Sequence, residues 1–210
     1  MPWPPKIIKS FEIAESTGVK DESRFYGPYN TLLTYLFPFE EDFQVAPQYK
    51  RPRQSRSVDF TTIFIVSHGE HPVFFVEIKA SSHIEQISTR ADADKQMRER
   101  INSMFDSVKI DTLYGISALG TRLCVYKTQR ESGDIEPQGI ADNLLRVTDT
   151  APLERWNLNL LDGEGEKRVR EIVAHIKETS VSCHIVQNWK DFTNIFRRFR
   201  VGGIREGGRL

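Results

Sequence analysis

The stretch SVDFTTIFIVSHGEHPVFFVEIKA constrains the fold more than any other part of this chain. Two runs rich in β-branched and aromatic residues, 58–66 and 73–80, flank the polar segment SHGEHP. This pattern predicts a β-hairpin of two strongly apolar strands. Each strand nevertheless carries charge where a buried strand should not, because Asp59 begins the first, and Glu77 and Lys79 end the second.

The alternation of side chains across a strand predicts how these charges are arranged. Glu77 and Lys79 point to one face of the sheet, roughly 7 Å apart along the strand, and the apolar side chains between them point to the other. Asp59 shares the face of Glu77 only if the hairpin has an odd-length turn or a β-bulge. We therefore expect such a turn or bulge, and a cluster of Asp59, Glu77 and Lys79 at the open end of the hairpin.

Two carboxylates and a lysine at a strand end suit the hydrolysis of a phosphodiester with a divalent cation. Carboxylate oxygens of Asp59 and Glu77 are ligands that Mg²⁺ prefers, and they leave positions for water. The cation lowers the pKa of a bound water and neutralises phosphodiester charge, and Lys79 can orient that water or stabilise negative charge. The alternative is an ordinary solvated strand end, because E-x-K is a common tripeptide.

Periodic segments on both sides of the hairpin predict the remaining elements. DESRFYGPYNTLLTYLFP has helical apolar spacing, with Asp21 as N-cap and a regular part from Pro28, and a second helix starts at Ser88 with STRADADKQMRERINSMFDS. FQVAPQY predicts an edge strand because of Pro47, and TLYGISALGTRLCVYK predicts a hairpin that turns near Gly120. GDIEPQGIADN is a loop, and DGEGEKRVREIVAHIKE and NWKDFTNIFRRFR are helices.

These elements predict an α/β protein with a mixed central sheet flanked by helices. At 210 residues the chain is long enough for one large core. Residues 1–20 are Pro-rich and are expected to form an irregular arm. We expect the core over 21–130, a helical C-terminal part packed on it over 131–200, and a flexible tail over 201–210.

Composition narrows the functional classes. The formal net charge is zero, so attraction to nucleic acid must come from local patches. No apolar run approaches the roughly 20 residues of a membrane span, and the N-terminus has no apolar signal-peptide segment. Cys124 and Cys183 are too few for a disulfide framework. We expect an intracellular protein of the nucleus or cytoplasm, neither secreted nor bound to a membrane.

The hairpin and its neighbours resemble the PD-(D/E)XK nucleases, which include restriction endonucleases, Holliday-junction resolvases and repair nucleases. Their core runs helix, three-stranded meander, helix, strand, with an acid on the second strand and D/E-x-K on the third, as Asp59 and EIK stand here. The likeness covers roughly residues 21–128, and Val58 stands where the family motif has proline. The chain also resembles uncharacterised fungal proteins with segments like FYGPYN, ADKQMRER and LYGISALGT.

The resemblance implies a restriction-endonuclease-like αβββαβ core and a metal-dependent nuclease that cleaves DNA in preference to RNA. Asp59, Glu77, Lys79 and Gln96 would be catalytic, and Asp59, Glu77 and Glu22 would bind Mg²⁺ or Mn²⁺. Glu22 can instead favour the dipole at the start of its helix, and Gln96 can instead lie on a solvated helix face.

The resemblance implies nucleic acid, and DNA in the first place, as the partner. Basic residues near the hairpin are candidates for contact with its phosphates. A basic loop precedes Asp59, and Arg100 lies one helical turn after Gln96. The loop can equally be an ordinary solvated one. The competing function is a catalytically inactive nuclease-fold module that binds nucleic acid or a protein partner, and a homodimer stays open. The basic residues of the loop are Lys50, Arg51, Arg53 and Arg56.

Overall fold

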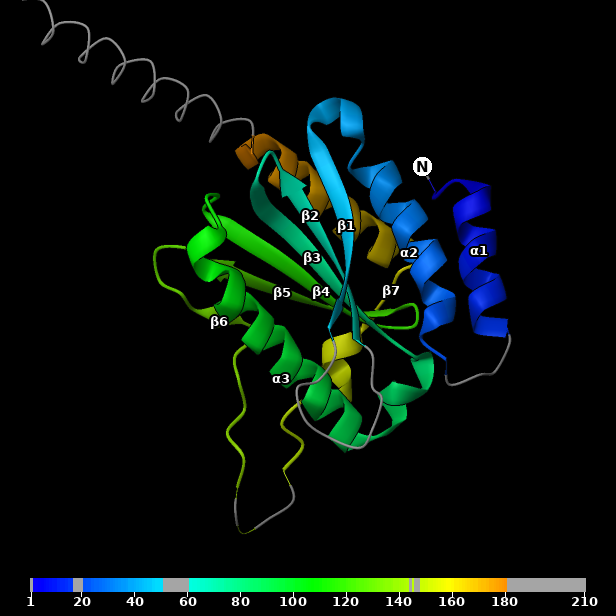
Figure 1. Ribbon diagram of the computed structural model, residues 1–210. Helices are drawn as coiled ribbons and strands as arrows, with labels where there is room; N and C mark the ends of the chain where they lie inside the picture. The colour runs from blue at the N-terminus through cyan, green and yellow to red at the C-terminus, as the bar shows by residue number, and fades with distance from the viewer. Residues whose placement is uncertain (1, 17–20, 51–60, 144, 146–147, 181–210) are drawn as a thin grey trace, which may run out of the picture.

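A mixed β-sheet forms the centre of the computed structural model, with helices on both of its faces (Figure 1). The structure describes residues 2–16, 21–50, 61–143, 145 and 148–180. Within them the sheet has seven strands in the order β1-β2-β3-β4-β5-β6, and β7 pairs with β5. The α/β class with a mixed, helix-flanked sheet is therefore confirmed. The strands are β1 (Phe43–Lys50), β2 (Thr61–His68), β3 (His71–Lys79), β4 (Thr112–Leu119), β5 (Arg122–Gln129), β6 (Ile135–Glu136) and β7 (Leu158–Asn159).

The hairpin β2–β3 contains the irregularity that its charges required. Next to the turn Ser67 pairs with Pro72, but the following pair is Val66 with Phe74, so β3 carries one extra residue there. This shift places Ile63 opposite Glu77, and odd-numbered residues of both strands share a face. The predicted bulge is confirmed, whereas Asp59 lies outside the described residues.

Two layers of helices enclose the sheet. α3 covers one face, and the opposite face is covered by α2 and by a helix over 163–180 (Figure 1). Ring contacts mark the second layer, because Phe37 meets Phe74 at 5.6 Å and Tyr114 meets His175 at 5.6 Å. The α-helices are α1 (Pro5–Ser16), α2 (Ser23–Leu36) and α3 (Ile87–Met104), and the 3-10 helices are η1 (Phe39–Glu41), η2 (Ser81–Glu85), η3 (Phe105–Ser107) and η4 (Leu153–Trp156).

The connection from β3 to β4 contains η2 and α3, and it makes the two strands parallel. A parallel pair needs such a crossover, because a tight turn can join only antiparallel strands. The other pairs in the sheet are antiparallel. The described core therefore runs in the order α2, β1, β2, β3, α3, β4.

The expectation of an irregular N-terminal arm is wrong. α1 buries Ile7, Phe11 and Ala14 along one side, at helical spacing, and Trp3 just before it is buried as well. The Phe11 ring packs edge-on against Tyr29 at 4.9 Å, and Trp3 Nε1 donates to the Leu160 carbonyl at 2.7 Å. The early prolines do not prevent this helix, because Pro5 is its first residue, where no N–H partner is required.

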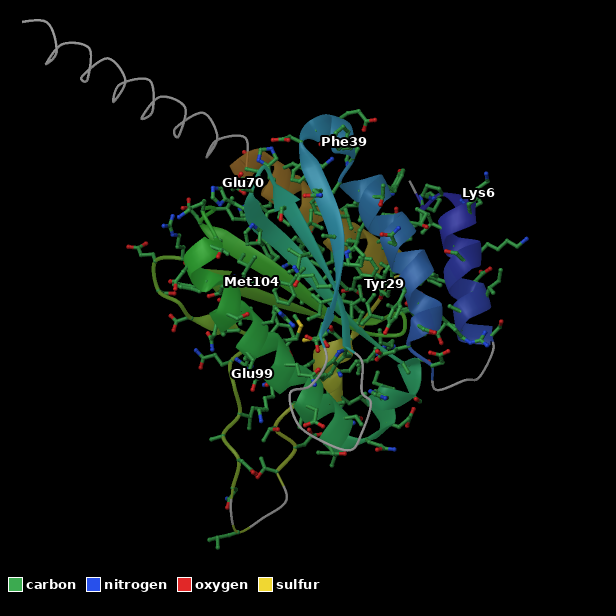
Figure 2. The ribbon with its side chains drawn as sticks, in the orientation of Figure 1. Lys6, Tyr29, Phe39, Glu70, Glu99 and Met104 are labelled. Carbon is green, nitrogen blue, oxygen red and sulfur yellow. The ribbon has the colours of Figure 1, made fainter. Side chains whose placement is uncertain are left out.

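The expected delay of the first core helix to Pro28 is also wrong. α2 begins at Ser23 and continues through Pro28, which is buried. Phe25 and Tyr29 pack into the core on either side of it, so tertiary packing offsets the missing N–H of proline. Figure 2 shows Tyr29 between α2 and the sheet. Asp21 is near the start, where its Oδ1 accepts the Ser23 N–H at 2.9 Å, but Glu22 occupies the N-cap position.

The region after β5 is less helical than expected. Strands β6 and β7 extend the sheet edge, and η4 lies between them in sequence. A two-residue strand has too little periodic pattern to show in a sequence. The helix predicted over DGEGEKRVREIVAHIKE (162–178) is confirmed and spans 163–180, whereas NWKDFTNIFRRFR and the tail over 201–210 lie outside the described residues. The apolar side chains of that helix at helical spacing, Val169, Ile172, Val173 and Ile176, are all buried.

Candidate functional site

Glu77 and Lys79 are buried at the end of β3. Their exposed fractions are 2% and 8%. Glu77 lies between Ile63 of β2 and Ser117 of β4, and the Lys79 carbonyl accepts the Gly120 N–H at 3.0 Å. A solvated strand end does not describe these two side chains. Ionisable groups this deeply buried are uncommon without pairing or function.

α3 covers the face of the sheet that carries Glu77 and Lys79. The odd-numbered residue Phe75 shares this face, and it lies beside Gly115 of β4. A Cβ built on Gly115 would come within 2.4 Å of the Phe75 ring and 2.9 Å of Met97 Cε. The absence of a side chain at Gly115 therefore lets α3 approach the sheet closely.

The two sides of α3 face different parts of the sheet. Asp94 Oδ1 accepts the hydroxyl hydrogen of Tyr126 in β5 at 2.8 Å, so this side of the helix faces β5. Gln96 and Arg100 lie on the other side of the Met97 row, because each residue advances the helix by about 100°. They therefore face β3 and β2. Glu99 lies on the outer side of α3, away from the sheet (Figure 2).

Gln96 and Arg100 do not lie on a fully solvated helix face. Both residues are half-buried, and Gln96 Oε1 and Arg100 Nε are buried atoms. Neither atom has a hydrogen-bond partner among the described residues. A buried polar atom without a partner is unusual and costs free energy, so both atoms are available to a ligand or to a part of the chain beyond the described ranges.

The basic loop and Asp59 lie between two described strand ends. Lys50 ends β1 opposite Thr61, the first residue of β2, and the next pair places Thr62 opposite Ile78 of β3. The chain therefore leaves and re-enters the sheet at the same end as Lys79. Arg51, Arg53, Arg56 and Asp59 themselves are outside the described residues, so their predicted roles stay predictions.

Glu22 belongs to the helix layer on the opposite face of the sheet. Its Oε1 accepts the hydroxyl hydrogen of Tyr26 at 2.6 Å, and the residue lies at the N-cap of α2. This position suits the alternative in which the negative charge of Glu22 interacts favourably with the dipole at the start of the helix. Its predicted role as a metal ligand stays a prediction.

A buried ionic network around Asp94 was missed by the sequence analysis. Asp94 binds Arg98 at 2.8 Å and Arg155 at 2.5 Å, in addition to Tyr126. Burial raises the pKa of Tyr126 far above its usual value, so its hydroxyl remains a donor. Only the Asp94–Arg98 pair, four residues apart on one helix, had a signal in the sequence. Arg155 is 61 residues away from Asp94.

Comparisons of the chain with protein-family models, with curated proteins and with solved structures found no match. Across the described ranges, no helix is long and apolar enough to span a membrane. No three His, Cys, Asp or Glu side chains of the described residues form a group that could hold a metal ion, but Asp59 is not among those residues. The features of the described structure that bear on function are therefore the fold and the buried pair Glu77 and Lys79 with their neighbours.

Proposed function

We propose that the protein is a metal-dependent nuclease of the PD-(D/E)XK type that hydrolyses phosphodiester bonds, in DNA rather than RNA. The observation that carries this proposal is the burial of Glu77 and Lys79 on one sheet face beneath α3. An acid and a lysine two residues apart on a strand, in a covered site, are the pair that this chemistry requires. The order α2, β1, β2, β3, α3, β4 supports the same core.

The residues present suit a hard divalent cation. Such cations prefer oxygen ligands, and Glu77 supplies a buried carboxylate. Gln96 Oε1 is a further buried oxygen with no hydrogen-bond partner among the described residues, on the side of α3 that faces β3. Asp59 and Glu77 would hold Mg²⁺ or Mn²⁺. The cation would supply a water of lowered pKa and neutralise phosphate charge.

Lys79, and Arg100 of α3, would stabilise negative charge on the substrate. Lys79 as a whole is 8% exposed, and in such a shielded site the effect of its charge on a developing negative charge is stronger than in bulk water. Arg100 Nε would donate to a phosphate oxygen. Lys50 and the basic residues after it would contact the nucleic-acid backbone at the end of the sheet where Lys79 lies.

The experiment is incubation of the full chain with plasmid and single-stranded DNA, with and without Mg²⁺ or Mn²⁺. Glu77→Gln should weaken both Mn²⁺ binding and cleavage, because it removes the charge of a ligand. Lys79→Met should keep Mn²⁺ binding and lower turnover by about 10²–10⁴-fold. Lys95→Ala, on the exposed side of α3, is the matched control and should change neither.

Circular dichroism and the melting temperature establish that each variant is folded. Cleavage that survives in folded Glu77→Gln and Lys79→Met would contradict the proposal. Wild-type protein that binds DNA but neither binds Mn²⁺ nor cleaves would favour the alternative, an inactive nuclease-fold module.

A further inference from the structure

A groove of about 570 Å³ opens at the outer edge of β5, two strands away from Glu77. Cys124 and Val125 of β5 form its floor. Pro137, which follows β6, and Leu158 of β7 close its two ends. One wall is η4 and the other is the N-terminal half of the helix at 163–180. Its volume lies within the roughly 300–1,000 Å³ of typical ligand sites.

The backbone N–H and C=O groups of successive β5 residues point alternately toward β4 and toward the opposite edge of the strand. The Thr121 carbonyl accepts the Leu160 N–H at 2.9 Å, and the Gln129 carbonyl accepts the Gly133 N–H at 2.9 Å. Neither donor belongs to β4. In an antiparallel strand, alternate residues direct both N–H and C=O to the same side, so the odd-numbered residues of β5 face away from β4.

Three odd-numbered residues lie between those two positions. Leu123 pairs with Leu158 of β7, and Lys127 pairs with Glu136 of β6. Val125 lies between them, directs its N–H and C=O outward, and is half-buried at the floor of the groove. No hydrogen-bond partner of these two groups occurs among the described residues.

Both flanking strands leave the sheet before they reach Val125. A continuation of β6 in register would bring Gln138 opposite Val125, but the Gln138 carbonyl accepts Arg155 Nη2 at 2.6 Å. A continuation of β7 would bring Trp156 there, but its carbonyl accepts Arg122 Nε at 2.9 Å. The two arginines hold the chain away, so the gap at Val125 is built into the fold.

The outward N–H and C=O of Val125 can both be paired by a single residue of another strand. A ligand residue in extended conformation offers its own C=O and N–H at the same spacing, as in the addition of a strand to a sheet edge. A single residue in register fits, because β6 and β7 occupy the edge on either side. The rest of the ligand must leave the groove between its two walls.

The charges of the walls favour a peptide over a phosphate-bearing ligand. The groove is lined by carboxylates and cations in equal number, the carboxylates being Glu136, Glu154, Glu164 and Glu171 and the cations Lys127, Arg155, Lys167 and Arg168. A phosphate would meet several carboxylates at close range, whereas a peptide with both an ammonium and a carboxylate group finds a partner for each.

We propose that this groove binds a short extended peptide, one residue of which pairs with the N–H and C=O of Val125. The site is separate from Glu77 and Lys79 and does not depend on the nuclease proposal. The ligand carries charges of both signs and reaches both walls.

The test is a titration of the ¹⁵N-labelled full chain with the tetrapeptide Lys-Ala-Ala-Glu, followed by NMR. A parallel titration uses adenosine monophosphate. Saturable shifts of the Val125 amide with the peptide, and none with the nucleotide, are expected. No saturation by millimolar peptide, or saturation of the same amide by the nucleotide instead, would overturn the proposal.

Val125→Pro removes the outward N–H and leaves the bonds to β4, because those come from even-numbered residues. It should weaken peptide binding about 10-fold, as expected for one lost hydrogen bond, whereas Val125→Ala keeps the N–H and should bind as the wild type does. Equal affinity of Val125→Pro and wild type would refute the pairing.

A second variant tests the proposal if Val125→Pro does not fold. Lys167 and Glu171 are exposed on the helix at 163–180, so the double substitution Lys167→Glu with Glu171→Lys should fold normally. It exchanges the two charges along the wall and should weaken peptide binding several-fold. Unchanged affinity would refute the role of the wall.

Discussion

Neutralising Asp94 is the sharpest test of how the described structure is held together. Its carboxylate accepts Arg98 Nε at 2.8 Å, Arg155 Nη1 at 2.5 Å and the Tyr126 hydroxyl at 2.8 Å. The exposed fractions of the Asp94 and Arg155 side chains are 10% and 8%. The substitution Asp94→Asn keeps the shape of the side chain and removes its charge, so Arg155 loses its buried counter-ion.

The expected loss of stability follows from the burial of the pair. Breaking a buried ion pair by removing one partner costs about 3–5 kcal/mol. The low end applies here, because Asn retains one acceptor and Arg155 still binds the Gln138 carbonyl. We therefore expect a loss of about 3 kcal/mol in the free energy of unfolding. At 2–4 °C per kcal/mol for a chain of this size, the melting temperature should fall by roughly 6–12 °C.

Urea denaturation followed by tryptophan fluorescence measures this change, since Trp156 lies in the η4 segment that contains Arg155. The matched control is Glu171→Gln, which breaks the exposed pair between Arg168 and Glu171, 3.4 Å apart. The control should lose less than about 1 kcal/mol. A loss in Asp94→Asn no larger than the control's would refute the assignment of Asp94 as the anchor of η4.

Two further predictions concern positions where the described packing is tight. Gly115→Ala should destabilise the protein by about 1–3 kcal/mol because its methyl group would overlap the Phe75 ring, whereas Gly27→Ala, with no atom within 4 Å, should be neutral or stabilising in thermal unfolding. In a Cys183→Ser background, Cys124 should not react with a thiol reagent at pH 8 until the protein unfolds, because burial raises its pKa to about 12 and the thiolate is scarce. Fast labelling of the native protein would contradict this.

The central hairpin could be predicted in detail because its residues constrain one another. Strong β-branched and aromatic runs identified β2 and β3. A shared face for Glu77 and Asp59 called for an odd-length turn or a bulge, and the register between Val66 and Ser67 shows a bulge. The burial of Glu77 and Lys79 could not be predicted in this way. It depends on α3, which is 18 residues long and approaches the sheet over Gly115.

Other features depend on contacts between distant parts of the chain, which a local pattern does not contain. Ile7 and Phe11 have helical spacing, but the prolines at the start of the chain suggested an arm. The packing of Phe11 against Tyr29 shows the helix to be part of the core. The groove at Val125 is more remote still from any motif. It arises because β6 and β7 both end before they reach Val125, which leaves its backbone groups unpaired by either strand.

The helix α3 connects the two candidate sites because its two polar sides face opposite directions. Its Gln96 side faces β3, where Glu77 and Lys79 are buried, and its Asp94 side anchors Arg155, which draws Gln138 away from Val125. The same helix therefore covers one site and keeps the other open. The Asp94 network can be weakened without touching the Gln96 side, so effects on the proposed peptide binding and on the proposed nuclease activity are separable by experiment.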